Sequence, residues 1–236
     1  MAADTPIRAV IFDIGATLVT GPPVAPNKVI AELLREVTAA EVASVIMTQP
    51  FESAEHVCAG LKKSLGVQID ARSRLGIELL WETQSRAPVG IRGACETVLE
   101  LKKRGLKIGL LSDIWTPYYR GVERELPEII DAADSIVLSY LTGHRKPEPA
   151  NFRTALDELG AEPQETVMVG DTYEHDIRPA IELGMRTIWI LARPDREAES
   201  IVRVGTGQAP EPTWTVTDIC DVRSLDAQLS TLDAER

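Results

Sequence analysis

The sequence predicts an α/β protein built on a Rossmann-like, doubly wound parallel sheet, with a small helical domain inserted after the first strand. Three observations lead to this prediction. Short apolar runs recur along the chain, as expected for buried strands. Segments with helical periodicity separate them, which is typical of strand–helix–strand units. One long stretch, residues 20–89, shows helical periodicity throughout and contains no run that predicts a strand.

The predicted strands are short runs rich in Val, Ile and Leu, a composition typical of strands buried on both faces. In chain order they cover residues 8–12, 106–112, 135–139, 166–170, 185–190 and 214–218. Ligands of such sheets bind beyond the carboxyl ends of the strands. The residues that follow each run are therefore the first candidates for a functional site.

Helices are predicted between these strands. Residues 93–105 and 150–160 each close on a glycine, the residue that most often caps a helix C-terminus. A third helix covers residues 174–184, with Pro179 in or near its first turn. A last helix is expected over residues 222 to about 232. Each of the first three is long enough to cross over between parallel strands.

The stretch from residue 20 to residue 89 opens with Gly-Pro-Pro and continues as three segments with apolar residues at helical spacing. We interpret it as a helical cap domain that packs over the ends of the sheet. The predicted core domain then comprises residues 1–19 and 90–236, and the cap domain comprises residues 20–89.

Composition limits the partners of this chain. The net charge of −11 over 236 residues disfavours nucleic-acid binding, because an acidic surface repels a polyanion. No apolar run approaches the roughly 20 residues that span a bilayer, so no membrane partner is expected. The acidic, polar N-terminus is unlike a signal peptide. Three widely separated cysteines do not predict a disulfide framework. A cytoplasmic location fits these features.

Polar residues follow the first two predicted strands of the core. Asp13 comes directly after the first run, where a carboxylate can attack phosphorus and form an acyl phosphate. Ser112 and Asp113 end the second run. The Ser112 hydroxyl and the backbone N–H groups around Asp113 are suited to binding phosphate oxygens. We therefore expect both segments to contact a substrate.

Two further clusters add a cation and metal ligands. Lys146 offers a point charge to the same phosphate oxygens. Asp171 can coordinate Mg²⁺ directly, while Asp176 can hold a metal-bound water or orient Lys146. Magnesium suits this set because it is a hard cation that binds one or two carboxylates together with water and phosphate oxygens. The four clusters together predict a phosphoryl-transfer site.

In this order the clusters resemble the four motifs of the haloacid dehalogenase-like superfamily, whose cap is inserted between the first and second motifs. The likeness extends from Ala9 to about Leu225. It is strongest in GDTYEHD at 170–176 and RKPEPANF at 145–152, which together are a specific signal. The resemblance implies a phosphatase-type hydrolase with a helical cap.

The resemblance also implies how the site is assembled. It places the first strand beside the strand that ends at Gly170, which brings Asp13 close to Asp171. It assigns Mg²⁺ to Asp13, Asp171 and the backbone carbonyl of Gly15, with Asp176 in support. The expected reaction is the hydrolysis of a small phosphorylated metabolite through a phosphorylated Asp13.

The first motif departs from the family pattern. Members usually carry a second aspartate two residues after the nucleophile, which protonates the leaving group and then deprotonates the attacking water. Here that residue is Gly15, and Ala16 replaces the glycine that usually follows. General acid–base catalysis is typically worth about 10²–10⁴-fold. Three interpretations follow: the substrate needs no acid; another residue supplies it, either one from the cap or His144 or Glu148 of the core; or the protein has given up phosphatase chemistry.

Two other functions therefore compete with the phosphatase. Haloacid dehalogenases lack the second aspartate because a halide leaves without protonation, but they use no metal and do not keep a site like that of Asp171 and Asp176. A non-catalytic member that binds a phosphorylated ligand or a partner is the third interpretation. The sequence leaves the substrate and the oligomeric state open.

The aromatic residues near the second motif have two interpretations. We favour packing for those in residues 115–119, with Thr116 as the cap of a helix. Trp81, in the predicted cap, is the better candidate to face a substrate.

Overall fold

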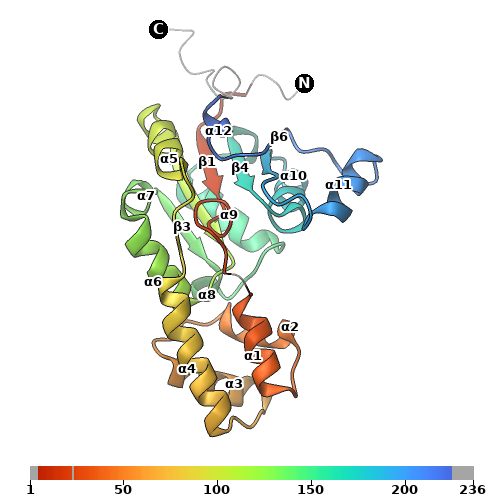
Figure 1. Cartoon of the computed structure of the whole chain (residues 1–236). Helices are drawn as coiled ribbons and strands as arrows, with labels where there is room; N and C mark the ends of the chain where they lie inside the picture. Colours follow the sequence, from red (N-terminus) through yellow and green to blue (C-terminus); the bar gives the residue numbers. More distant parts are fainter. Residues whose placement is uncertain (1–4, 23, 225–236) are drawn as a thin grey trace.

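A six-stranded sheet forms the centre of the computed structural model, which describes residues 5–22 and 24–224 (Figure 1). The strands are β1 (Ala9–Phe12), β2 (Lys107–Ser112), β3 (Ser135–Leu138), β4 (Thr166–Gly170), β5 (Arg186–Ile190) and β6 (Trp214–Val216). They lie in the order β3-β2-β1-β4-β5-β6, and every neighbouring pair is parallel. The predicted doubly wound sheet is confirmed, although the last strand ends at Val216.

The two faces of the sheet are covered because alternate residues of each strand point to opposite sides. In β1, Val10 and Phe12 belong to the same apolar cluster as Val98. Ile11 packs on the other face in a second cluster that contains Phe152. A strand that is apolar at every position is therefore buried on both sides, as the continuous run predicts.

The core helices match most of the predicted ones. They are α5 (Ala94–Lys103), α6 (Thr116–Glu125), α7 (Pro127–Ala132), α8 (Ser139–Thr142), α9 (Pro149–Leu159), α10 (Arg178–Glu182), α11 (Ala198–Gly205) and α12 (Asp221–Ser224), with a 3₁₀ turn, η1, at Pro163–Glu165. Gly160 follows α9 in the left-handed conformation, as expected for a C-cap. The predicted last helix overlaps α12, and its remainder lies outside the described residues.

One predicted helix differs in form. Residues 174–184 were expected to form a single α-helix, but a π-helical turn, η2 (Tyr173–Ile177), precedes the short helix α10. The wider turn carries the Asp176 side chain back over Gly170, where an added Cβ would lie 2.5 Å from the Asp176 carboxyl. Any side chain at residue 170 would collide with it, so this close approach requires glycine.

Helices α1 (Pro26–Leu34), α2 (Ala39–Ile46), α3 (Ala54–Leu65) and α4 (Ala71–Arg86) gather at one end of the molecule, at the bottom of Figure 1. Local sequence explains their starts. Thr38 forms a capping box with Glu41, and Ser53 and Asp70 cap the next two helices. No helix among the described residues is long and apolar enough to cross a membrane. The boundaries of the cap domain, 20 and 89, stay a prediction.

The four helices pack on the core through α6. Trp81 of α4 meets Trp115 edge to face, with ring centroids 5.8 Å apart. A side chain at Gly121 would lie 2.7 Å from Pro88, so glycine allows α6 to approach the end of α4. The prediction that Thr116 caps α6 is wrong. Trp115 is the N-cap, and the Thr116 hydroxyl instead accepts the N–H of Phe51 from the helical segment.

Candidate active site

The sheet brings the first, second and fourth motifs together because β1 lies between β2 and β4. Asp13 follows β1, Ser112 ends β2 and Asp171 follows β4, so all three stand at the carboxyl ends of adjacent strands. The backbone N–H of Asp13 donates to the Val169 carbonyl at 2.9 Å and continues the pairing past the end of β1. The predicted neighbourhood of Asp13 and Asp171 therefore follows from the strand order.

Lys146 connects the motifs through its buried ammonium group. Nζ lies 2.7 Å from Asp13 Oδ1 and 2.6 Å from Asp176 Oδ1. It also donates to the Leu111 carbonyl at 3.3 Å, which accounts for its three donors. The Ser112 hydroxyl donates to the same Asp13 oxygen at 3.2 Å. Asp13 is thus fixed from two sides.

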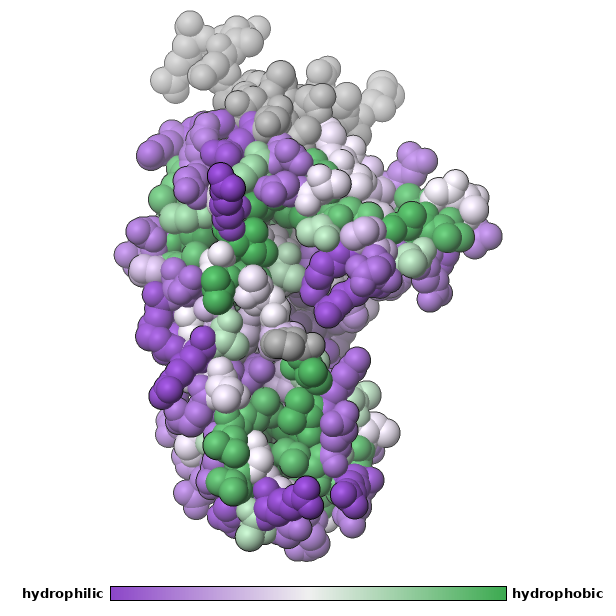
Figure 2. Space-filling view, viewed as in Figure 1, coloured by the Kyte–Doolittle hydropathy of each residue, from purple (hydrophilic) through white to green (hydrophobic). Residues whose placement is uncertain are grey.

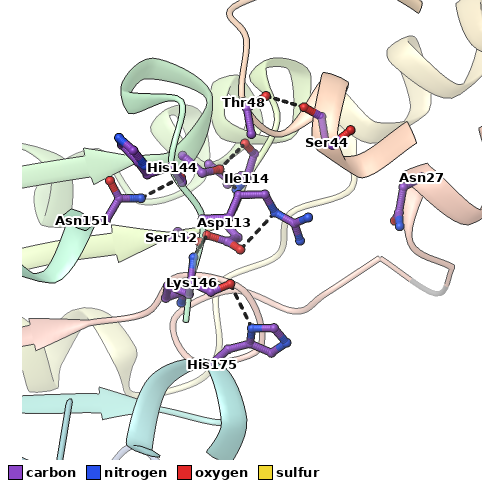
Figure 3. A network of polar contacts seen from close by, with 12 residues as sticks. Asn27, Ser44, Thr48, Ser112, Asp113, Ile114, His144, Lys146, Asn151 and His175 are labelled. Carbon is purple, nitrogen blue, oxygen red and sulfur yellow. Dashed lines mark hydrogen bonds and ion pairs between the residues drawn. The ribbon is translucent and has the colours of Figure 1, made fainter. Parts of the chain in front are cut away.

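Asp113 holds the segment that carries Lys146. One carboxylate oxygen accepts the backbone N–H of Lys146 at 2.9 Å, and the other accepts from Arg145 Nε at 3.3 Å. Figure 3 shows Asp113 beside Lys146, whose carbonyl contacts His175 Nδ1 at 3.2 Å. The carboxylate therefore positions the lysine, while the predicted substrate contact through Asp113 stays a prediction.

Three buried carboxylates form the only cluster among the described residues that could hold a metal ion. Oxygens of Asp13, Asp171 and Asp176 all lie within 4.8 Å of one another. Asp176 is fixed by the Thr172 N–H, which donates to its Oδ2 at 3.0 Å. Hard oxygen donors at this density suit a small divalent cation. The predicted metal-binding carboxylates thus do converge.

The carboxylates are held in an environment that disfavours their charge. Burial raises the pKa of Asp13 to about 6, with the Lys146 ammonium acting in the opposite direction. Burial also raises the pKa of Asp171 and Asp176. For Lys146, burial alone would lower the pKa, but the nearby carboxylates raise it, so this side chain stays charged. A further cation would relieve the excess of negative charge.

The residue that replaces the usual acid lies in open space. A Cβ added at Gly15 would meet no heavy atom within 4 Å in the part of the chain that the structure describes. The following residue, Ala16, has φ of 62°, a left-handed conformation that favours glycine. Gly15 lines both a small cavity over the carboxylates and the larger cavity beside it. The missing aspartate thus leaves a volume that no other described side chain fills.

The alternative acids suggested by the sequence lie elsewhere. His144 Nδ1 contacts Glu148 at 2.9 Å, and both side chains are more than half exposed. Neither residue lines the two cavities at the carboxylates. The structure does not bring this pair to Asp13.

A cavity of about 820 Å³ separates the carboxyl ends of the strands from α1 and α4. Figure 2 shows the recess between the two parts of the molecule. Trp115 and Tyr118 line it although both are buried, and Trp115 Nε1 donates to Gln84 at 3.3 Å. The packing role predicted for these aromatics is confirmed, a contact with substrate stays a prediction, and Trp81 is not among the described residues that line the cavity.

Sequence reasoning missed Arg193, which follows β5. Its guanidinium donates to Asp171 Oδ2, and its side chain lines both cavities. Arg196 and Lys28 line the larger cavity as well. Arg193 is one strand further along the same sheet edge, so its place after an apolar run is the signal that could have revealed it.

The fold and the carboxylate cluster define an α/β protein with a candidate metal-binding site at the carboxyl ends of a parallel sheet. Comparison with known families identifies the family of this protein. A model described as haloacid dehalogenase-like hydrolase matches residues 7–184. The chain belongs to this family.

Individual relatives match over shorter stretches. A glyceraldehyde 3-phosphate phosphatase of Pyrococcus furiosus is 34% identical over 99 residues, 42% of this chain and 41% of that protein. A phosphoserine phosphatase of Thermus thermophilus is 34% identical over 114 residues, 45% of this chain and 43% of that protein. The chain thus spans about two fifths of the length of these curated relatives.

Solved structures share the fold over nearly the whole chain. A HAD phosphatase from Thermococcus onnurineus has a TM-score of 0.61 at 22% identity, covering 93% of this chain and 97% of that one. A 2-haloacid dehalogenase from Pseudomonas syringae pv. tomato has a TM-score of 0.63 at 18% identity, covering 95% and 100%. At these identities the likeness establishes the fold and does not choose between the two activities.

Proposed function

We propose that this chain is a magnesium-dependent phosphatase that hydrolyses a small phosphorylated metabolite with Asp13 as the nucleophile. One observation carries the proposal: the carboxylates of Asp13, Asp171 and Asp176 converge within 4.8 Å around the Lys146 ammonium at the edge of a cavity. The phosphatase names of the partial relatives support the same reaction class. A cytoplasmic location stays a prediction from the sequence.

The donor set suits Mg²⁺. Asp13, Asp171 and the Gly15 carbonyl would hold the ion, with Asp176 in support. Among the described residues, the three carboxylates form ion pairs with two cationic side chains, Lys146 and Arg193, so a divalent cation offsets the remaining charge. When bound, Mg²⁺ would neutralise charge on the oxygens of the transferring phosphoryl group.

The residues of the chain then have distinct tasks. An Asp13 carboxylate oxygen attacks phosphorus, the ester oxygen leaves, and a phosphorylated Asp13 results. The Ser112 hydroxyl and the Lys146 ammonium hold the phosphoryl oxygens and offset their charge. Water then attacks phosphorus, releases phosphate and restores the Asp13 carboxylate.

Gly15 predicts a preference among substrates. Without an acid beside the leaving oxygen, esters whose alcohols leave as stable anions should react fastest, such as aryl phosphates and sugar 1-phosphates. Simple alkyl phosphates should be slower by about 10²–10⁴-fold, the usual worth of general acid catalysis. Equal kcat/KM for aryl and alkyl phosphates would contradict this reasoning.

Gly15 also favours a second candidate, a dehalogenase that forms an ester on Asp13, because a halide needs no proton to leave. Chloride release from 2-chloropropionate in EDTA would reveal that activity. The convergence of Asp171 and Asp176 with Asp13 favours the phosphatase, since a halide displacement needs no metal ligands. Binding of Mg²⁺ and phosphate without turnover would instead support a non-catalytic member of the family.

The proposal is tested by phosphate release from p-nitrophenyl phosphate, with Mg²⁺ and with EDTA, for the native protein and Asp13→Asn. The leaving group of this ester needs no acid, so Gly15 should not limit the rate. We expect release that requires Mg²⁺ and is lost in Asp13→Asn. Release that persists in EDTA or in the variant would overturn the proposal.

A further inference from the structure

The larger cavity extends well beyond the carboxylate cluster. It is lined on one side by α1 and the end of α4 and on the other by the segments after β1, β2 and β5. Its volume of about 820 Å³ leaves room for the organic part of a substrate whose phosphate lies at Asp13. The side chains of this cavity therefore bear on which phosphate esters fit.

Cationic groups dominate the charge of this lining. Lys28 projects from the helical segment, and Arg193 and Arg196 come from the loop after β5. Asp113 is the only carboxylate among the described residues that line the cavity, and both of its oxygens already accept hydrogen bonds. In a chain with a net charge of −11, a positive lining in a cavity beside the candidate active site is a local reversal of charge.

Arg193 connects the cavity to the carboxylates. One terminal nitrogen donates to Asp171 Oδ2, while the other, Nη1, lies toward Gly21, 3.8 Å from where a Cβ of that residue would stand. A guanidinium has five donors in one plane, so Arg193 can hold Asp171 and a ligand oxygen together. Lys28 and Arg196 have no ion-pair partner among the residues that the structure describes.

We propose that this cavity binds the organic part of a phosphate monoester with a second anionic group, a carboxylate or another phosphate. Arg193 is its principal partner, and Arg196 and Lys28 complete the subsite. The apolar faces of Trp115 and Met47 pack against the carbon skeleton between the two anionic groups. This inference rests on the proposed function, because it assumes that the first phosphate lies at Asp13.

The test compares matched ligands that differ only in the second charge. Each ligand is titrated into the Asp13→Asn protein in buffer that contains Mg²⁺, and calorimetry then measures its affinity without turnover. The carboxylate pair is 3-phosphoglycerate and glycerol 3-phosphate; the phosphate pair is propane-1,3-diol bisphosphate and 3-hydroxypropyl phosphate. In at least one pair, the doubly anionic member should bind about tenfold tighter, since charge-assisted hydrogen bonds in a cavity are worth at least this factor. The pair that shows it identifies the chemistry of the second group.

Variants assign the preference to the subsite. When Arg193→Gln or Arg196→Gln is added to the Asp13→Asn protein, the tenfold preference for the doubly anionic ligand should fall to about threefold or less. Arg153→Gln is the matched control. Arg153 is exposed on α9, so this substitution removes the same charge at a place away from the cavity. Equal affinity within both pairs, or an equal loss in the control, would overturn the proposal.

This result is separable from the proposed function. If p-nitrophenyl phosphate is not hydrolysed but the tenfold preference and its loss in Arg193→Gln are observed, the phosphatase proposal fails and the anion subsite stands. If the ester is hydrolysed in an Mg²⁺-dependent way but neither pair is discriminated, the subsite fails alone.

Discussion

Restoring an aspartate at residue 15 tests whether the absence of a general acid limits the reaction. In Gly15→Asp, the new Cβ meets no heavy atom of the described residues within 4 Å, and the backbone of this residue is not in the left-handed region. The first atom of the new side chain therefore displaces no neighbour among the described residues, and Gly15 lines the same small cavity as Asp13. The surrounding carboxylates of Asp171 and Asp176 favour its protonated form, which is the form that can donate a proton.

The expected gain depends on the leaving group. For an alkyl phosphate, a positioned acid should raise kcat/KM by about 10²–10⁴-fold, equivalent to about 3–5 kcal/mol of barrier. For p-nitrophenyl phosphate, the change should stay within about threefold, because p-nitrophenolate leaves without a proton. The assay is phosphate release from glycerol 3-phosphate and from p-nitrophenyl phosphate under identical Mg²⁺ concentrations.

Gly15→Asn is the matched control, since asparagine has nearly the same size and no acidic proton. It should give no gain with either ester. If Gly15→Asp accelerates both esters equally, or if Gly15→Asn does as well as Gly15→Asp, the residue acts by packing and the reasoning is refuted.

Three further predictions concern stability. Ala16→Gly should raise the free energy of unfolding by about 1 kcal/mol and Tm by about 2–4 °C, because φ of 62° strains alanine; an unchanged or lower Tm would contradict this. Because burial raises the pKa of Asp13 from 3.8 to about 6, its contribution to stability is lost as pH rises from about 4 through 6. In EDTA, Asp13→Asn should therefore be as stable as the native protein near pH 4 and more stable by up to about 3 kcal/mol at pH 8, as measured by chemical denaturation. The same difference in free energy of unfolding at both pH values would argue against this reasoning. Lys146→Met removes the buried partner of two carboxylates and should cost about 3–5 kcal/mol at pH 8, and less at pH 5, below the raised pKa of Asp13; a loss that does not vary with pH would exclude this cause.

Much of the fold follows from local patterns. Each strand is a continuous apolar run, and each run is flanked by helical periodicity, so the parallel sheet is predicted from residues alone. The neighbourhood of β1 and β4 is different, because the two are more than 150 residues apart and only the family resemblance implied their pairing. Strand order depends on tertiary packing that no local pattern encodes.

The candidate site, like the fold, could be predicted in part from local patterns. Asp13, Ser112 and Asp171 follow apolar runs, and the sheet edge brings them together. Arg193 follows the apolar run of β5, but that run alone does not show that it ends beside Asp171, because this depends on the place of β5 next to β4. The π-helical turn at η2 was missed because residues 174–184 have ordinary helical periodicity, and the close approach of Asp176 to Gly170 is a tertiary contact that this periodicity does not encode.

The central claim is that Asp13 itself receives the phosphoryl group. The most direct measurement is an acid quench during turnover of p-nitrophenyl phosphate with Mg²⁺, followed by borohydride reduction and mass spectrometry of the peptide that contains Asp13. Borohydride converts an acyl phosphate to an alcohol, so we predict an Asp13 side chain reduced to the alcohol in protein quenched with substrate and not in protein quenched without it. An unmodified Asp13 in protein that is releasing phosphate at the time of the quench, or reduction at another carboxylate, would contradict the account.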